Sequence, residues 1–299
     1  MARNALAAIG LLIVVSGCGG GVSDPASARC PSPASRAGAR VVLKDHIELP
    51  VTFTCVGARI RGTLFLPRSN GPHPALAWVH AAGPVQRLGW HGITSRFVDA
   101  GYAIFSFDKR GVGQSGGECC PGDTGHFNLA TADVVGAVAA LRKISQIDAA
   151  HIGLFGASQA GWIAPRAAVE SGHVAFVVLA APGIVTFGQE HRYEQLTGGN
   201  GSDKPFPSES QITKALGDPS GFDVRPYLRR LNVPILWLLA GRDKEVPLRP
   251  SLAILKRLAR AGKDYSVKIY PGAGHGLFDV PPTSPKALPD TLAWLRSHH

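Results

Sequence analysis

The stretch that decides the fold of this chain is Gly-Ala-Ser-Gln-Ala-Gly, residues 156–161. It follows the apolar run 151–155 and precedes a stretch compatible with a helix, which predicts a serine on a tight turn between strand and helix. Small residues on both sides of the serine let the two backbones approach closely. Ser158 is therefore a candidate nucleophile, although Ala160 stands where this pattern usually has a second glycine.

Apolar runs alternate with helix-like stretches along the rest of the chain. The predicted strands are residues 41–49, 51–56, 58–66, 75–79, 102–107, 151–155, 174–180, 233–239 and 265–270. The predicted helices are residues 93–100, 129–144, 159–171, 249–261 and 286–297. Parallel neighbours need crossovers of this length, so the alternation predicts an α/β fold with a mainly parallel sheet and helices on both faces.

One segment, residues 187–223, interrupts this alternation. It is polar, contains Gly-Gly-Asn-Gly at 198–201, and lies between two predicted strands where a crossover alone would be shorter. We interpret it as a small lid inserted over the carboxyl edge of the sheet, where open α/β sheets place ligands. A long surface loop is the alternative, because the helical signal in this segment is weak.

A serine hydroxyl becomes a good nucleophile when a histidine takes its proton and a carboxylate orients that histidine. Asp243 follows the predicted strand 233–239, and His275 lies in a glycine-rich loop after the last predicted strand. Glu245 is the nearest competing acid, and we prefer Asp243 because it lies closer to the strand end. The order Ser158, Asp243, His275 matches one of the common triad orders.

The oxyanion of a tetrahedral intermediate needs preorganised donors. The backbone N–H of Gln159 is one candidate, and the loop after the strand 75–79 is expected to supply the second. Within that loop we prefer Ala82 over Ala81, and we expect His80 to brace the loop.

Five motifs occur in order between residues 51 and 295: Trp-Val-His-Ala-Ala-Gly-Pro at 78–84, a glycine-rich stretch at 101–117, the serine turn, and the loops at 239–247 and 270–278. Together they resemble the serine α/β-hydrolase superfamily, and within it bacterial esterases and dienelactone-hydrolase or prolyl-oligopeptidase-like hydrolases. The resemblance implies an α/β-hydrolase fold with an eight-stranded, mostly parallel sheet, a Ser–His–Asp triad and no cofactor.

Two further expectations come from the same comparison of motifs. Relatives usually carry His-Gly where this chain has His80-Ala81, and a positive φ at Ala81 would strain the loop. Asp108 and Arg110 match the family as well, and we interpret them as residues that brace loops.

The N-terminus resembles a bacterial lipoprotein signal. Residues 1–17 combine a charged start with a short apolar core, and Cys18 ends a lipobox. This predicts cleavage before Cys18 and lipid attachment to its sulfur, followed by a flexible tether (18–40) and the hydrolase domain (41–299). The expected location is the membrane of the bacterial cell envelope, facing the periplasm or the outside. A signal cleaved elsewhere or an N-terminal helix is the alternative.

Four further cysteines are Cys30, Cys55, Cys119 and Cys120, and three pairings of the four are possible. We favour Cys30 with Cys55, whereas Cys119 and Cys120 are left as a vicinal bridge, as free thiols or with other partners. No Cys-x-x-Cys or His-Glu-x-x-His spacing predicts a metal site. The net charge of +10 favours an anionic membrane surface or acidic substrates, and the basic residues are too scattered to predict nucleic-acid binding.

These features predict a lipid-anchored serine hydrolase that cleaves small carboxylic esters through an acyl-enzyme. A peptidase, an aminoacyl-amide hydrolase or an acyltransferase would use the same three residues on other acyl groups. A non-catalytic binding lipoprotein that kept the fold is an alternative of a different class, because fold alone does not fix function.

Overall fold

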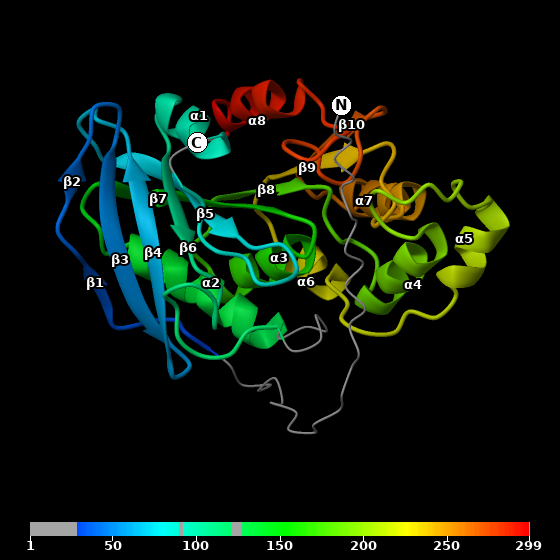
Figure 1. The fold of residues 1–299 in the computed structure, drawn as a ribbon, viewed down its shortest axis with the longest axis horizontal. Coiled ribbons are helices and arrows are strands. Elements are labelled where there is room, and N and C mark those ends of the chain that lie inside the picture. Colours follow the sequence, from blue (N-terminus) through cyan, green and yellow to red (C-terminus); the bar gives the residue numbers. More distant parts are fainter. Residues whose placement is uncertain (1–28, 90–91, 121–126, 299) are drawn as a thin grey trace, which may run out of the picture.

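A ten-stranded sheet runs through the computed structural model, which describes residues 29–89, 92–120 and 127–298 (Figure 1). The strands are β1 (Ser35–Ala37), β2 (Val41–Val42), β3 (Ile47–Cys55), β4 (Ala58–Leu66), β5 (His73–Val79), β6 (Ala103–Phe107), β7 (Ile147–Ala157), β8 (Phe176–Ala180), β9 (Ile235–Ala240) and β10 (Tyr265–Tyr270). Their order is β1-β3-β4-β6-β5-β7-β8-β9-β10, and β2 pairs with β3. The strands from β6 to β10 in this order are parallel, whereas β1 to β4 pair antiparallel.

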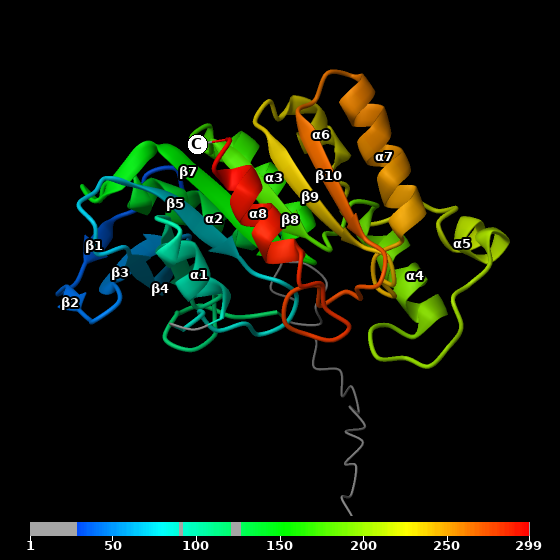
Figure 2. The same cartoon turned by 90° about the horizontal axis from the view of Figure 1, so that it is seen from above.

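Helices cover both faces of the parallel part, as predicted. α1 (Ile93–Asp99) and α8 (Ala287–Leu295) pack on one face, and α2 (Phe127–Leu141), α3 (Ala160–Ser171), α6 (Arg225–Arg230) and α7 (Leu248–Arg260) pack on the other (Figures 1 and 2). Every residue of β6, β8 and β9 is buried as a result. Strands buried on both faces read as continuous apolar runs, which is why the sequence predicts them well.

The N-terminal strands differ from the expectation. The predicted strand 41–49 is divided into β2 and the start of β3, and β3 continues through Pro50, opposite Thr63, into the predicted strand 51–56. The tether expected through residue 40 ends earlier, because β1 pairs with β3 and Cys30 is buried against Phe53 and Gly136. Edge pairing and burial of this apolar thiol hold the segment on the domain. The two short strands β1 and β2 therefore extend the predicted eight-stranded sheet to ten.

The predicted signal, residues 1–17, and the lipid-attachment residue Cys18 lie outside the described residues. Among the residues that are described, no helix combines the length and apolar character needed to cross a bilayer.

The segment interpreted as a lid contains two short helices and leads into α6. α4 (Phe187–Thr197) and α5 (Glu209–Ala215) extend beyond the β9–β10 end of the sheet (Figure 1). Both begin with a capping box: the side chains of Thr186 and Ser208 accept from backbone N–H groups three residues on, and Gln189 and Gln211 reciprocate. The weak helical signal arises because α5 buries none of its residues.

The cysteines pair differently from the favoured arrangement. Cys119 and Cys120 form a vicinal disulfide, and Cys30 and Cys55 are buried free thiols. The expected Cys30–Cys55 bridge is therefore absent, although the two thiols are hydrogen-bonded to each other. Cys30 Sγ also lies 3.6 Å from the carbonyl oxygen of Thr54.

Candidate active site

Ser158 occupies the turn between β7 and α3 in a strained conformation. Its φ is +54°, a region that side chains other than glycine rarely adopt. A Cβ on Gly156 would lie 2.4 Å from the Cβ of Ala160 and 2.6 Å from the oxygen of Val79. The methyl group of Ala160 fits because Gly156 has no side chain, so the departure from the usual pattern is accommodated at this turn.

Backbone hydrogen bonds hold the turn in place. The N–H of Ser158 donates to the oxygen of Ala180 at 3.1 Å. The Ser158 carbonyl accepts from Gly161 at 2.9 Å and from Gly183 at 3.0 Å. A Cβ on Gly161 would lie 2.2 Å from the oxygen of Gly183, so the chain after β8 passes very close to the turn. These contacts fix the backbone that carries the serine hydroxyl.

The structure brings Asp243 and His275 together. Asp243 follows β9, is 4 % exposed, and accepts from the N–H groups of Glu245 and Val246 at 2.8 Å each. His275 lies in the loop after β10, and its Nδ1 is 3.1 and 3.0 Å from the two carboxylate oxygens of Asp243. The acid is thus a fixed acceptor that orients the imidazole with Nδ1 toward it.

The other ring nitrogen of His275 meets Glu245. Nε2 lies 3.0 Å from Glu245 Oε2, and among the described residues no hydrogen bond joins Ser158 Oγ to this imidazole. Burial alone would lower the pKa of His275, but the hydrogen bonds to Asp243 and Glu245 outweigh it and raise the pKa to about 10. The structure therefore holds an imidazolium between two carboxylates. Sequence reasoning named Glu245 only as a rival to Asp243.

A third carboxyl group lies near the imidazole and was not found from the sequence. Glu190, in the first turn of α4, is 9 % exposed, and its Oε2 has no hydrogen-bond partner among the described residues. Burial raises the pKa of Glu190 well above its ordinary value, against the attraction of the His275 charge. No motif marks it, because it stands in a polar segment whose packing is set by the tertiary structure.

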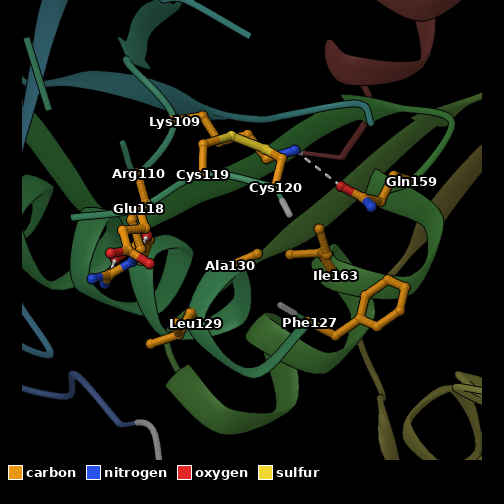
Figure 3. A pocket seen from close by; sticks show the side chains of 11 residues that line it. Lys109, Arg110, Glu118, Cys119, Cys120, Phe127, Leu129, Ala130, Gln159 and Ile163 are labelled. Carbon is orange, nitrogen blue, oxygen red and sulfur yellow. Dashed lines mark hydrogen bonds and ion pairs between the residues drawn. A yellow bond between two sulfur atoms is a disulfide. The ribbon is translucent and has the colours of Figure 1, made fainter. Parts of the chain in front are cut away.

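Lys109 connects the two parts of the predicted oxyanion hole. Its Nζ donates to the oxygens of Ala81 at 3.1 Å and Gly83 at 2.9 Å. It also donates to Gln159 Oε1 at 3.2 Å (Figure 3). Ala82 lies in the bridged loop. The strain that a positive φ at Ala81 would cause does not arise, since Ala81 has no positive φ and the left-handed residue of this loop is Gly83, with φ +77°. Lys109 is thus a site residue that the sequence reasoning passed over between Asp108 and Arg110.

The residues expected to brace loops make the corresponding contacts. His80 Nε2 lies 2.6 Å from the oxygen of Phe107, and burial lowers the pKa of His80 to about 4, so the ring is neutral and donates. Asp108 accepts from two backbone N–H groups at 2.9 Å each. Arg110 forms a buried bidentate pair with Asp133 at 3.0 and 2.6 Å. Within the described ranges, no group of three or more His, Cys, Asp or Glu side chains is arranged to hold a metal ion.

Comparison with known proteins identifies relatives of this chain. The model of the prolyl oligopeptidase family matches residues 91–299. The human acylamino-acid-releasing enzyme is 22% identical over 215 residues, which are 70% of this chain and 29% of the relative. The thiohydrolase aneE of Aspergillus aculeatus is 32% identical over 138 residues, which are 46% of this chain and 42% of the relative. The chain thus spans less than half the length of either relative.

A solved structure extends the comparison to the fold. Acetyl xylan esterase 1 from Thermoanaerobacterium sp. superposes with a TM-score of 0.64 at 21% identity, covering 90% of this chain and 89% of the esterase. The predicted α/β-hydrolase fold is confirmed.

Proposed function

This chain belongs to the prolyl oligopeptidase family, within the serine α/β-hydrolase superfamily, and we propose that it is a serine hydrolase of small carboxylic esters. The observation that carries the proposal is the Asp243–His275 pair, at 3.0 Å, beside the sheet edge where the strained turn presents Ser158. A carboxylate-oriented imidazole and a serine on a strained turn at one sheet edge are the groups that acyl transfer requires.

In the proposed reaction, Ser158 Oγ attacks the ester carbonyl carbon and its proton passes to His275 Nε2. The N–H groups of Gln159 and Ala82 would donate to the oxyanion, and Asp243 would stabilise the imidazolium. The C–O bond to the alcohol then breaks, and the alcohol leaves with the proton from Nε2. Water, deprotonated by the same nitrogen, attacks the acyl-enzyme and releases the acid and the free serine.

This reaction requires the imidazole to exchange partners. His275 Nε2 faces Glu245 in the structure, and it must turn from that carboxylate to accept a proton from Ser158. Only the neutral imidazole can accept this proton, so the reaction begins from the small neutral fraction of a histidine whose pKa is about 10. Glu245 therefore lowers the activity of the resting enzyme, because it occupies Nε2 and stabilises the protonated imidazole.

Cleavage of amides is the second candidate. Its support is the family itself and the likeness to the human acylamino-acid-releasing enzyme. We favour esters because the esterase structure matches nearly the whole of both chains, whereas this chain spans 29% of the human relative. Turnover of matched ester and aminoacyl-amide substrates by one preparation separates the two activities.

The test of the chemistry is the Ser158→Ala variant. We expect it to abolish hydrolysis of p-nitrophenyl butanoate and covalent labelling by a fluorophosphonate, because no hydroxyl remains to form the acyl-enzyme. Ser171→Ala, at the far end of α3, is the matched control and retains both. Persistent labelling of the Ser158 variant would place the nucleophile elsewhere.

We also propose that the enzyme is a lipoprotein anchored through Cys18 in the cell envelope. The support is the lipobox pattern in residues 1–17 and the following cysteine. Two or three acyl chains hold a protein on a membrane stably, where one does not. Cys18→Ser should move the protein from the membrane to the soluble fraction, and unchanged fractionation would refute the anchor.

A further inference from the structure

A pocket opens beside the serine turn (Figure 3). It lies between the loop that follows β6 and the first turns of α2 and α3. Gln159, the residue directly after Ser158, forms one end of it. Its position places an occupant beside Gln159, the residue whose backbone N–H is the predicted oxyanion donor.

The walls of this pocket are mainly apolar. Phe127, Leu129 and Ala130 contribute from α2, and Ile163 contributes from α3. The Cys119–Cys120 disulfide covers the opposite side, and its sulfur atoms carry no proton to donate (Figure 3). Such a surface gains free energy by taking apolar groups out of water.

Three of the four charged side chains that line the pocket, Lys109, Arg110 and Asp133, have partners within the protein. Arg110 binds Asp133 through two hydrogen bonds and also donates to the carbonyl oxygen of Cys55 at 2.9 Å. Lys109 is engaged by Gln159 and the two loop carbonyls. The fourth, Glu118, is an exposed carboxylate, so the charges of the pocket give no reason for the occupant to be an anion.

The pocket also has an inner limit. Figure 3 shows Arg110 and Glu118 on the side opposite Gln159, with the apolar side chains between them. A growing alkyl chain that enters beside Gln159 would first cover Ile163 and Ala130 and would then meet the charged end. Desolvating a charged group without replacing its contacts is unfavourable, so the pocket suits chains of limited length.

We propose that this pocket is the acyl subsite, and that the enzyme prefers esters of uncharged, apolar acids of medium length over acetate and over long-chain or anionic acids. The inference rests on the proposed function, because it takes Ser158 as the nucleophile. With the carbonyl carbon at Ser158 and the oxyanion at the Gln159 N–H, the acyl chain extends along Ile163 toward Leu129, and the alcohol lies outside the pocket.

The experiment compares kcat/KM for p-nitrophenyl acetate, hexanoate, dodecanoate and hemisuccinate. We expect kcat/KM for hexanoate to exceed that for each of the others by about tenfold or more, because each methylene group buried in a hydrophobic pocket raises kcat/KM. Ala130→Leu fills the pocket and should remove the advantage of hexanoate while acetate changes little. Ala139→Leu is the matched control, since Ala139 is a partly buried alanine of the same helix away from the pocket and should leave the ratio unchanged.

A second variant keeps the test independent of the fit of one leucine. Leu129→Ala lengthens the apolar part of the pocket and should raise the ratio of dodecanoate to hexanoate turnover severalfold. Equal losses on acetate and hexanoate in a folded Ala130→Leu enzyme, or a preference for hemisuccinate, would overturn the subsite alone. Absence of ester turnover in the parent enzyme would instead overturn the proposed function, so the two failures are distinguishable.

Discussion

Replacing Glu245 by glutamine should make the enzyme active at lower pH. His275 accepts a proton from Ser158 only when its Nε2 is unprotonated, so kcat/KM rises with pH through the pKa of this imidazole. Glu245 stabilises the protonated form through the 3.0 Å contact with Nε2. Removing that charge lowers the pKa from about 10, and the acid limb of the profile moves to lower pH.

The size of the shift follows from the contact. A hydrogen bond between charged groups contributes about 1.5–3 kcal/mol, and a pKa unit corresponds to about 1.4 kcal/mol. The side chain of Glu245 is 26 % exposed, so solvent screens part of the attraction and the lower end applies. We therefore expect a shift of about one pH unit and, on the acid side, a kcat/KM about tenfold higher than that of the parent enzyme.

The measurement is the pH profile of kcat/KM for p-nitrophenyl butanoate, followed in a pH-stat from acid to alkaline pH. Glu209→Gln, an exposed carboxylate on α5, is the matched control and should leave the profile unchanged. Asp243→Asn should also lower the pKa of His275, but it should reduce kcat/KM at every pH because the imidazole loses its orientation. An acid limb that stays in place or moves to higher pH in Glu245→Gln would refute the restraining role.

Two further predictions concern contacts described above. Lys109→Met should lower kcat about tenfold to a hundredfold with little change in KM, because it frees the loop carbonyls and the Gln159 side chain that hold the oxyanion donors. Steady-state kinetics measure this effect, and Lys256→Met, at an exposed lysine, is the control. Asp133→Asn should lower the free energy of unfolding by about 3 kcal/mol, because it leaves the buried Arg110 guanidinium without a charged partner. Urea unfolding measures this change, and an unchanged midpoint would contradict a stabilising role for the Arg110–Asp133 pair.

The sequence predicts those parts of the fold whose signal is local. β6, β8 and β9 are continuous apolar runs because both of their faces are covered, and the small residues at 156 and 160 mark the turn that carries Ser158. β1 has no such signal. Its three residues, Ser-Arg-Ala, form a strand only because the edge of β3 offers hydrogen bonds.

The sequence does not predict which way the side chains of the site point, and their directions decide the roles of Asp243, Glu245 and Lys109. Asp243 and Glu245 are two residues apart in one loop, and local pattern does not decide which carboxylate meets Nδ1 and which meets Nε2 of His275. Lys109 stands beside Asp108 in a stretch recognised as loop-bracing, yet its ammonium reaches a loop some 26 residues earlier and a turn 50 residues later. These contacts depend on packing between segments far apart in the chain.

The inserted segment 187–223 takes part in the same arrangement, because it holds the loop that carries both acids. Tyr193 OH donates to the carbonyl oxygen of Asp243 at 3.2 Å. The backbone N–H of Asn200 donates to the Glu245 carboxylate. Burial alone would raise the pKa of Glu245, but the interactions with His275 and Asn200 lower it. A displacement of this segment would remove a donor that stabilises ionised Glu245. That loss would raise the pKa of Glu245 and weaken its hold on Nε2, whereas the Asp243 side chain would keep its own backbone donors. The contact between Glu245 and His275 Nε2 therefore depends on the position of the insertion, because the insertion supplies the backbone N–H of Asn200 to the Glu245 carboxylate.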